Sequence, residues 1–362
     1  MQIDFHHGVI YLLSRIAGFN AEQSSKIAYA SQYVDDATNS GIIKFNNGAR
    51  YSRISSAHKV FDLRNFNSLF NLQVWTPFHF LPGNGGLKAG ENPDGKFINK
   101  LVCTPDSYPA KDMVELCLND ADKPYALHRL GITLHVLADT FSHKGFAGVS
   151  HRINDVEELN SELFSFRKNK FKNTLERITS VFVDNLMPLG HGAALKYPEY
   201  PFQKWDYING LGQKVVRDNP AIYMEASKVL YRTIARFNAR ILGRSVQEKL
   251  PEKDLKLIEK NINGFRDEDV KLRYECWKKS IMEDDFSFEK EENEQIEYIA
   301  KGVGSWKHKA LNTEKEKDNE SDFFEYKPDF LTSNWKCFHV AIQKHRLEIL
   351  HDILPKYGIC GA

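Results

Sequence analysis

The segment 124–151 constrains the fold and the chemistry of this chain more than any other stretch of its sequence. It holds four of the chain's 13 histidines among closely spaced apolar residues. Pro124 is favoured in the first turn of a helix, and Gly145 marks a helix end. We therefore expect a helix that begins at Pro124 and ends at about Ser142 or His143.

The polar residues of this helix fall on one face. At about 100° per residue, His128, His135 and Asp139 lie within about 40° of one another, and His143 lies about 40° further round. Gly131 lies beside them, where a second backbone can approach. Imidazole and carboxylate groups suit zinc, and two side chains four residues apart can reach one ion. A hydrogen bond within the helix is the plainer alternative, but burying so many ionisable groups without a metal or a compensating network is costly. This face therefore predicts a metal site.

Apolar residues recur at helical spacing through most of the chain, which predicts an all-α fold, a multi-helix bundle around the metal site. Asn20 and Gln23 have the spacing of a capping box for an early helix. Beyond the segment above, amphipathic helices are expected at 10–18, 20–38, 155–186, 219–243 and 331–353. Turn residues predict a short hairpin or a long loop at 41–55, and ordered loops at 76–109, which covers or lines a site, and 187–215.

Composition changes after about residue 245. We place a metal-binding catalytic domain at 1–245 and a charge-rich helical C-terminal region at 246–362, with a linker near 305–328. Such regions often bind a protein partner or mediate self-association. Lys and Arg together number 49 and Asp and Glu 48, for a net charge of +1. That balance argues against a nucleic-acid binder that relies on bulk positive charge.

The cysteines and the N-terminal segment bear on the compartment. Five cysteines without C-x-x-C spacing predict neither a disulfide framework nor a thiolate zinc site, as is typical of a reducing compartment. No apolar run reaches the ~20 residues of a membrane-spanning helix. The first residues also lack the basic and apolar regions of a signal peptide. We therefore expect no transmembrane segment and a cytoplasmic protein, apart from export by a signal-independent route.

One helix does not complete a polynuclear site, so other segments must supply ligands. His6 and Asp35 each share a helix face with apolar residues, and both are expected to point inward. The main candidate metal ligands are His6, His7, Asp35, His58, His79, His135, Asp139, His143 and His191. A second set, as ligands or as partners of ligands, comprises Asp4, Asp36, His128, His151, Asp155 and Glu199.

The order of these residues resembles that of the zinc-dependent phospholipase C and S1/P1 nuclease superfamily. Asp35, in Tyr-Val-Asp, resembles the aromatic-x-Asp element of that superfamily, and His58 resembles the histidine that follows it. The segment from His135 to Asp139, with His143 after it, resembles the central His-x3-Asp motif. The last His and carboxylate of the superfamily correspond either to His151 with Asp155 or to His191 with Glu199.

This resemblance implies an all-helical fold around three zinc ions, with Asp35 as a bridging ligand. The chain departs from the pattern in having three residues between Asp139 and His143, where the superfamily has five. The superfamily also uses its processed N-terminal amine as a ligand, for which Asp4 is the candidate replacement here. The number of zinc ions is then two or three. Residues 1–215 further resemble an uncharacterised bacterial domain family through the elements YVDDAT, PFHFLP, HxxADxxSH and GH…YPxxP.

These features predict a zinc-dependent hydrolase of a phosphoester, above all a phosphodiester of a phospholipid or a nucleic acid. Two metal ions can activate water and stabilise charge on a phosphoryl oxygen, and Asp35 is the expected catalytic residue. The basic run at 167–177 is a candidate substrate contact. An HD-type phosphohydrolase is disfavoured because no aspartate follows the single His-Asp pair, His351-Asp352. The alternative is a non-catalytic helical interaction protein with a structural metal or none.

Overall fold

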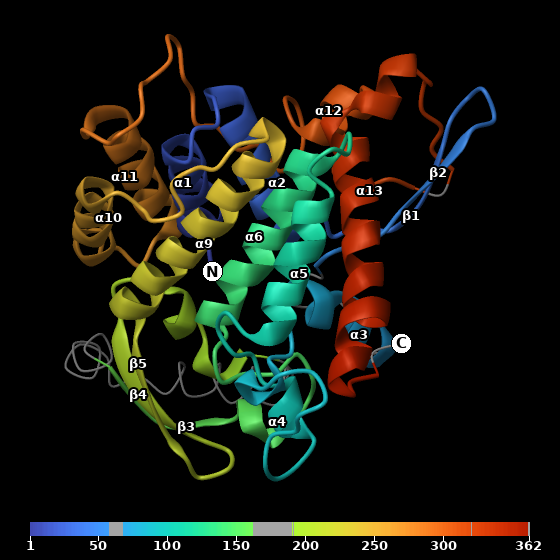
Figure 1. Ribbon diagram of the computed structural model, residues 1–362. Helices are drawn as coiled ribbons and strands as arrows, with labels where there is room; N and C mark the ends of the chain where they lie inside the picture. The colour runs from blue at the N-terminus through green and yellow to red at the C-terminus, as the bar shows by residue number, and fades with distance from the viewer. Residues whose placement is uncertain (58–67, 162–189, 191, 320, 361–362) are drawn as a thin grey trace, which may run out of the picture.

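The computed structural model describes residues 1–57, 68–161, 190, 192–319 and 321–360 (Figure 1). The protein is mostly helical. Its α-helices are α1 (Ile10–Ile16), α2 (Ala21–Asp36), α3 (Ser68–Phe78), α4 (Ile98–Leu101), α5 (Tyr108–Asn119), α6 (Ala126–Ser142), α9 (Asn219–Leu242), α10 (Glu252–Gly264), α11 (Val270–Glu283), α12 (Trp306–Leu311) and α13 (Asn334–Leu347). The π-helices are η1 (Asp4–Val9) and η8 (Glu348–Ile353). The 3-10 segments are η3 (Asn84–Gly86), η4 (Arg152–Asn154), η5 (Gly192–Ala194), η6 (Tyr197–Glu199), η7 (Pro328–Thr332) and η9 (Leu354–Tyr357).

Helix α6 lies at the centre of the molecule, between α9 and α13, with α2 and α5 also packed on it (Figure 1). The predicted close approach at Gly131 is confirmed. A Cβ added there would lie 2.3 Å from the carbonyl oxygen of Ile27 and 2.7 Å from the Cβ of Ala30. Only glycine therefore allows α2 and α6 to pack this closely, and their packing brings the end of α2 beside the histidine face of α6.

Local signals determine several of the helix ends. The capping box is formed, because the side chain of Asn20 accepts from the backbone N–H of Gln23 at 2.8 Å, and the Gln23 side chain accepts from that of Asn20 at 3.2 Å. Asp218 caps α9 by accepting from the N–H of Ala221 at 3.2 Å. The helices predicted at 124–143, 219–243 and 331–353 correspond to α6, to α9, and to α13 continued by η8.

Two small antiparallel sheets correct the prediction of an all-α fold. Strands β1 (Gly41–Lys44) and β2 (Arg50–Arg53) form a hairpin, which is one of the two alternatives for 41–55. Strands β3 (Val156–Ser161), β4 (Lys204–Asn209) and β5 (Lys214–Asp218) form the second sheet in the order β3-β4-β5.

Strand β3 contradicts the start of the helix expected at 155–186, whose residues from 162 onward lie outside the described ranges, and strands β4 and β5 replace part of the loop expected at 187–215. Strand β3 pairs with β4, a segment far along the chain that local periodicity does not report, whereas β4 and β5 pair with each other as neighbours in the sequence. Trp205 and Tyr207 lie on one face of β4 with ring centroids 5.0 Å apart, and Tyr207 stacks on Phe146 at 5.7 Å. Burial of these rings, rather than strand propensity alone, stabilises the sheet.

The C-terminal region packs against the helices that carry the candidate ligands. Trp277 of α11 belongs to the same apolar cluster as Phe5 of η1. Trp306 and Phe338 pack with Tyr29 and Tyr33 of α2 in a second cluster. Residues on both sides of position 245 therefore contribute to shared cores.

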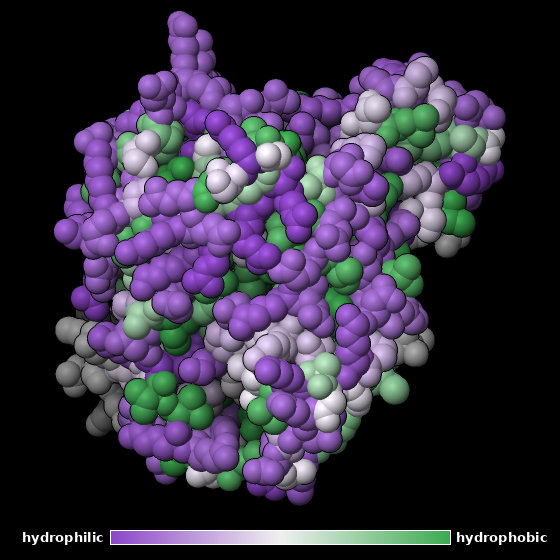
Figure 2. All heavy atoms as spheres, viewed as in Figure 1, coloured by the Kyte–Doolittle hydropathy of each residue, from purple (hydrophilic) through white to green (hydrophobic). Residues whose placement is uncertain are grey.

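The face shown in Figure 2 is covered mainly by hydrophilic side chains, with small separate apolar patches, one of them over β4 and β5. Val216 of β5 is among the exposed apolar residues, at 73%. Across the described ranges, no helix combines the length and the apolar character that a membrane crossing requires.

Candidate metal centre

Five ionisable side chains from four parts of the chain converge beside α6. His135 and Asp139 come from α6 itself, and the other three are His6 of η1, Asp35 near the end of α2, and His79, which follows α3. Two overlapping groups of these residues could hold a metal ion: His6, His135 and Asp139, and Asp35, His79 and His135. Within each group the ligand atoms lie within 4.8 Å of one another.

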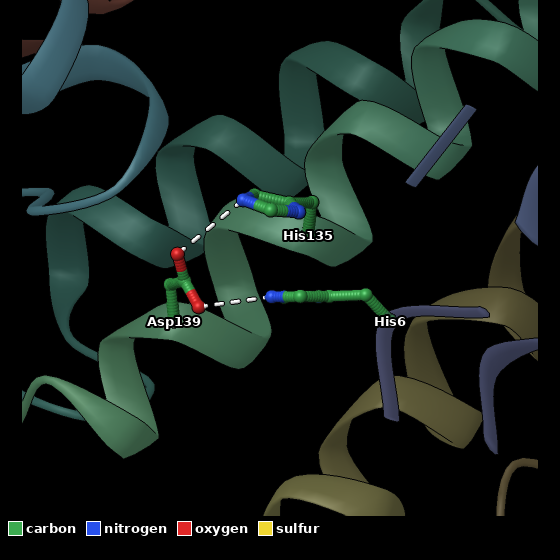
Figure 3. A group of neighbouring side chains, drawn as sticks. All are labelled: His6, His135 and Asp139. Carbon is green, nitrogen blue, oxygen red and sulfur yellow. Dashed lines mark hydrogen bonds and ion pairs between the residues drawn. The ribbon is translucent and has the colours of Figure 1, made fainter. Parts of the chain in front are cut away.

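The carboxylate of Asp139 lies between the two groups. Its Oδ1 is 3.1 Å from Nε2 of His6 and accepts from the α-amino group of Met1 at 2.5 Å. Its Oδ2 is 3.3 Å from Nε2 of His135 and 3.3 Å from Nδ1 of His79. Figure 3 shows Asp139 directed between the rings of His6 and His135, which lie nearly parallel with centroids 3.9 Å apart.

The ring of His79 is oriented by backbone groups. Its Nε2 donates to the carbonyl oxygen of Ser56 at 3.0 Å, so in the neutral ring Nδ1 carries the lone pair. That lone pair faces Nε2 of His135 at 3.3 Å and a carboxylate oxygen of Asp139. Next to it, His143 donates from Nδ1 to the carbonyl oxygen of His79 itself at 2.7 Å, which fixes the backbone that carries the ring. In metal sites generally, a hydrogen bond from the other ring nitrogen to a carbonyl or carboxylate oxygen orients the histidine, as the bond from His79 to Ser56 does here.

Asp35 faces the solvent side of the cluster. Its Oδ1 is 3.8 Å from both Nδ1 of His79 and Nε2 of His135. Its side chain is 34% exposed, whereas those of His79 and His135 are 5% and 0% exposed. Water can therefore reach the cluster along Asp35.

The pKa values of the two carboxyl groups of the cluster, Asp35 and Asp139, are shifted in opposite directions. Although part of the Asp35 side chain reaches solvent, the burial of its carboxyl group among the cluster raises its pKa well above the usual value, and the carboxylate of Asp139 adds to this. Burial acts in the same direction on Asp139, but the Met1 amine and the surrounding imidazoles outweigh it and hold the pKa of Asp139 well below its usual value. Burial lowers the pKa of His6 well below its usual value and that of His135 to about 4. The rings are thus neutral and available as ligands near pH 7.

Hydrogen bonds within the protein do not satisfy this cluster. Nδ1 of His6 and Nδ1 of His135 are both buried and have no hydrogen-bond partner in the described part of the chain. The lone pair on Nδ1 of His79 and those of the Asp139 carboxylate also face Nε2 of His135, which can supply at most one proton. Nε2 of His6 and Nε2 of His135 both face the Asp139 carboxylate, so a divalent cation would bind these nitrogens and satisfy the converging lone pairs, while the two Nδ1 atoms lie on the other edge of each ring. The residues that converge here therefore fit a metal ion bound by nitrogen and oxygen ligands.

Four other predicted ligands have partners away from the cluster. His7 accepts from the hydroxyl of Tyr274 at Nδ1, at 2.9 Å, if its proton is on Nε2. The remaining three are His128, 3.0 Å from Oδ1 of Asn334; Asp4, paired with Arg273 at 2.6 Å; and Asp36, which accepts from Tyr298 at 2.6 Å. The α-amino group of Met1, rather than Asp4, contacts the cluster.

The last predicted residues fall at the edge of the site or beyond it. Glu199 accepts from Gln2 at 2.9 Å. His151 caps η4 by accepting from the N–H of Ile153 at 3.0 Å, and Asp155 is exposed at the start of β3. His58, His191 and the basic run at 167–177 lie outside the described residues.

Two contributors to the site were not predicted. The carbonyl of Ser56 belongs to the backbone, so no residue type signals it. The Met1 amine could be suspected only from the superfamily resemblance.

The family of unknown function DUF6765 matches residues 1–353 of this chain. The chain belongs to this family. The match includes every residue of the cluster and also helices α11 and α13 of the C-terminal region. No curated protein and no solved structure matches the chain.

Proposed function

We propose that this site binds two zinc ions and hydrolyses a phosphodiester. The observation that carries the proposal is the position of Asp139, whose two oxygens face two ligand groups that also share His135. A carboxylate so placed is suited to bridging two cations, and paired metal ions serve the hydrolysis of phosphoesters in many enzymes. Imidazole and carboxylate ligands without a thiolate are compatible with zinc.

Each ion would have its own set of ligands. Oδ1 of Asp139 and Nε2 of His6 would hold one ion, with the Met1 amine beside them. Oδ2 of Asp139, Nδ1 of His79 and a carboxylate oxygen of Asp35 would hold the other, and His135 lies within reach of both. Bound zinc supplies Lewis acidity, which makes water acidic enough to ionise near neutral pH and offsets charge on a phosphoryl oxygen.

Asp35 is the proposed catalytic residue. It lies on the side of the cluster that solvent reaches, so its carboxylate can orient an attacking water and accept its proton. His79 lies beside Asp35, and the hydrogen bonds that His79 and His143 make to backbone carbonyls hold this part of the cluster in place. A structural zinc is normally enclosed by four protein ligands, whereas a catalytic ion keeps a position open to water. The exposure of Asp35 supports the catalytic alternative.

The test is the zinc content of the purified protein, measured by elemental mass spectrometry, for the wild type and two variants. His135→Gln removes the imidazole that lies within reach of both ions, and His128→Gln is the matched control because His128 is a buried histidine on the same helix outside the cluster. We expect about two zinc ions per chain in the wild type and the control, and fewer than one in His135→Gln.

Hydrolysis should follow zinc content. A chromogenic bis-aryl phosphodiester should be cleaved by the wild type and the control, and cleavage should stop with a chelator. Phosphatidylcholine vesicles and single-stranded DNA then distinguish the two sources of a phosphodiester. One zinc per chain that His135→Gln retains, together with no hydrolysis of any of these substrates, would instead favour a non-catalytic protein with a structural metal.

A further inference from the structure

Helix α11 of the C-terminal region contacts the short π-helix η1, which carries His6, through directional hydrogen bonds. Arg273 donates from Nε to Oδ2 of Asp4 at 2.6 Å and from Nη2 to Oε1 of Gln2 at 2.5 Å. Its remaining Nη1 donates to the carbonyl oxygen of Asp267 at 2.6 Å. Because Arg273 and Asp4 are 1% and 0% exposed, these contacts form in a water-excluded interior.

The next residue of α11 makes a second contact with η1. The hydroxyl of Tyr274 and Nδ1 of His7 are 2.9 Å apart, and the two rings meet edge to face with centroids 5.6 Å apart. His7 is 1% exposed, and its other nitrogen has no partner in the described part of the chain. Asp4 and His7 flank His6 in sequence, so α11 holds η1 on both sides of the ligand.

Because η1 is a π-helix, the contacts with α11 affect where the ring of His6 lies. A π-helical turn is wider than an α-helical one and is rare, and it occurs frequently at functional sites. Asp4 and His7 turn toward α11, while His6 turns toward Asp139 on α6. A small rotation or shift of η1 would therefore carry Nε2 of His6 away from the carboxylate that it shares with His135.

We propose that Arg273 and Tyr274 are positioning residues for His6, and that the C-terminal region is thereby part of the metal centre. This inference rests on the proposed binding of zinc. The two residues act through Asp4 and His7 and touch none of the five clustered side chains in the contacts described above. Their effect is confined to the ion held by His6, since Asp35 and His79 belong to other parts of the chain.

Directional contacts distinguish this role from ordinary packing. An apolar pair can replace a buried ion pair with little loss of stability, but it does not fix the register of the two elements as a multiply bonded guanidinium does. Tyr223 provides the comparison within the same core. Its ring packs edge to face on Phe5 of η1 at 5.0 Å, but its hydroxyl donates to the carbonyl oxygen of Pro198 at 3.1 Å, away from η1.

The experiment is a zinc titration against a chromophoric chelator, which resolves the two binding steps. Tyr274→Phe removes one hydroxyl. The double variant Asp4→Leu with Arg273→Met removes the ion pair and leaves no unpaired buried charge. Tyr223→Phe is the matched control, because it also removes a buried tyrosine hydroxyl beside η1. Metal-free melting temperatures and the visible spectrum of the cobalt-substituted protein are recorded for each.

We expect Tyr274→Phe and the double variant to weaken one zinc step about 10-fold to 100-fold and to leave the other step unchanged. The cobalt spectrum of these variants should change, while Tyr223→Phe should match the wild type in both measurements. If Tyr274→Phe and the double variant both bind zinc with wild-type affinity, the positioning role of Arg273 and Tyr274 is refuted, although the metal centre itself is not. Equal losses in Tyr274→Phe and Tyr223→Phe would refute the positioning role too, because packing alone would then explain them. A wild type that binds no zinc would overturn the metal centre and this inference together.

Discussion

Replacing Gly131 by alanine tests whether the close packing of α2 on α6 holds the candidate centre together. The added Cβ would lie 2.3 Å from the carbonyl oxygen of Ile27 and 3.0 Å from the backbone nitrogen of Ser31. Both atoms belong to the helix backbone and cannot rotate away. The two helices must therefore separate by about 1 Å to reach ordinary van der Waals contact.

The cost follows from this separation. Overpacking of a core costs about 1–3 kcal/mol, and a clash with two backbone atoms of α2 puts Gly131→Ala at the upper end. Alanine returns up to about 1 kcal/mol through its higher helix propensity. We expect the free energy of unfolding to fall by about 2 kcal/mol. Asp35 is carried on α2, and its Oδ1 is already 3.8 Å from the nearest ring nitrogens, so zinc binding should weaken as well.

Urea unfolding and zinc titration measure the two effects. Gly264→Ala is the matched control, since an added Cβ at this helical position meets nothing within 4 Å. The control should unfold at or slightly above the wild-type urea concentration and bind zinc normally. A Gly131→Ala protein as stable as the control, with unchanged zinc affinity, would refute the idea that this contact sets the distance between Asp35 and α6.

Three further outcomes are expected. Burial lowers the pKa of His128 and of His339 to about 3, against 6.5 in the unfolded chain. Above pH 6.5 both histidines are neutral in the folded and in the unfolded protein, whereas between pH 6.5 and 3 only the unfolded protein binds protons at them. Each histidine should therefore lower the free energy of unfolding by up to about 1.4 kcal/mol per pH unit in that range. Urea unfolding at pH 7 and pH 5 measures this, and equal stabilities would contradict it. Excess zinc at about 100 times its dissociation constant should stabilise the fold by about 2.7 kcal/mol, seen as a higher melting temperature that a chelator reverses; His128→Gln should retain this gain and His135→Gln should lose it. Asn20→Ala should cost about 1 kcal/mol by removing the cap of α2, and an unchanged urea midpoint would show that the capping box does not stabilise the native state.

Local sequence was sufficient wherever the determining contact lies within a few residues. The spacing of His135 and Asp139 puts both on one face of α6, because an α-helix returns to the same side after about four residues. The same holds for the capping box of Asn20 and Gln23, which closes within a single turn. Gly131 differs, because its contacts are with distant α2: a glycine on a crowded helix face indicates that a second backbone approaches, but not which one. The central helix, its polar face and the approach of another backbone at Gly131 could therefore be predicted.

Tertiary structure decided which of the remaining candidates meet that face. His6 and His7 are adjacent and both buried, but His6 contacts Asp139, 133 positions away, and His7 contacts Tyr274, 267 positions away. Asp4 likewise pairs with Arg273 rather than with the cluster. Neither the spacing nor the residue type distinguishes these cases, because their partners are brought together only when distant helices pack. Strand β3 was missed for the same reason: the hydrogen bonds that hold it come from β4, far along the chain, whereas those of a helix come from its own segment.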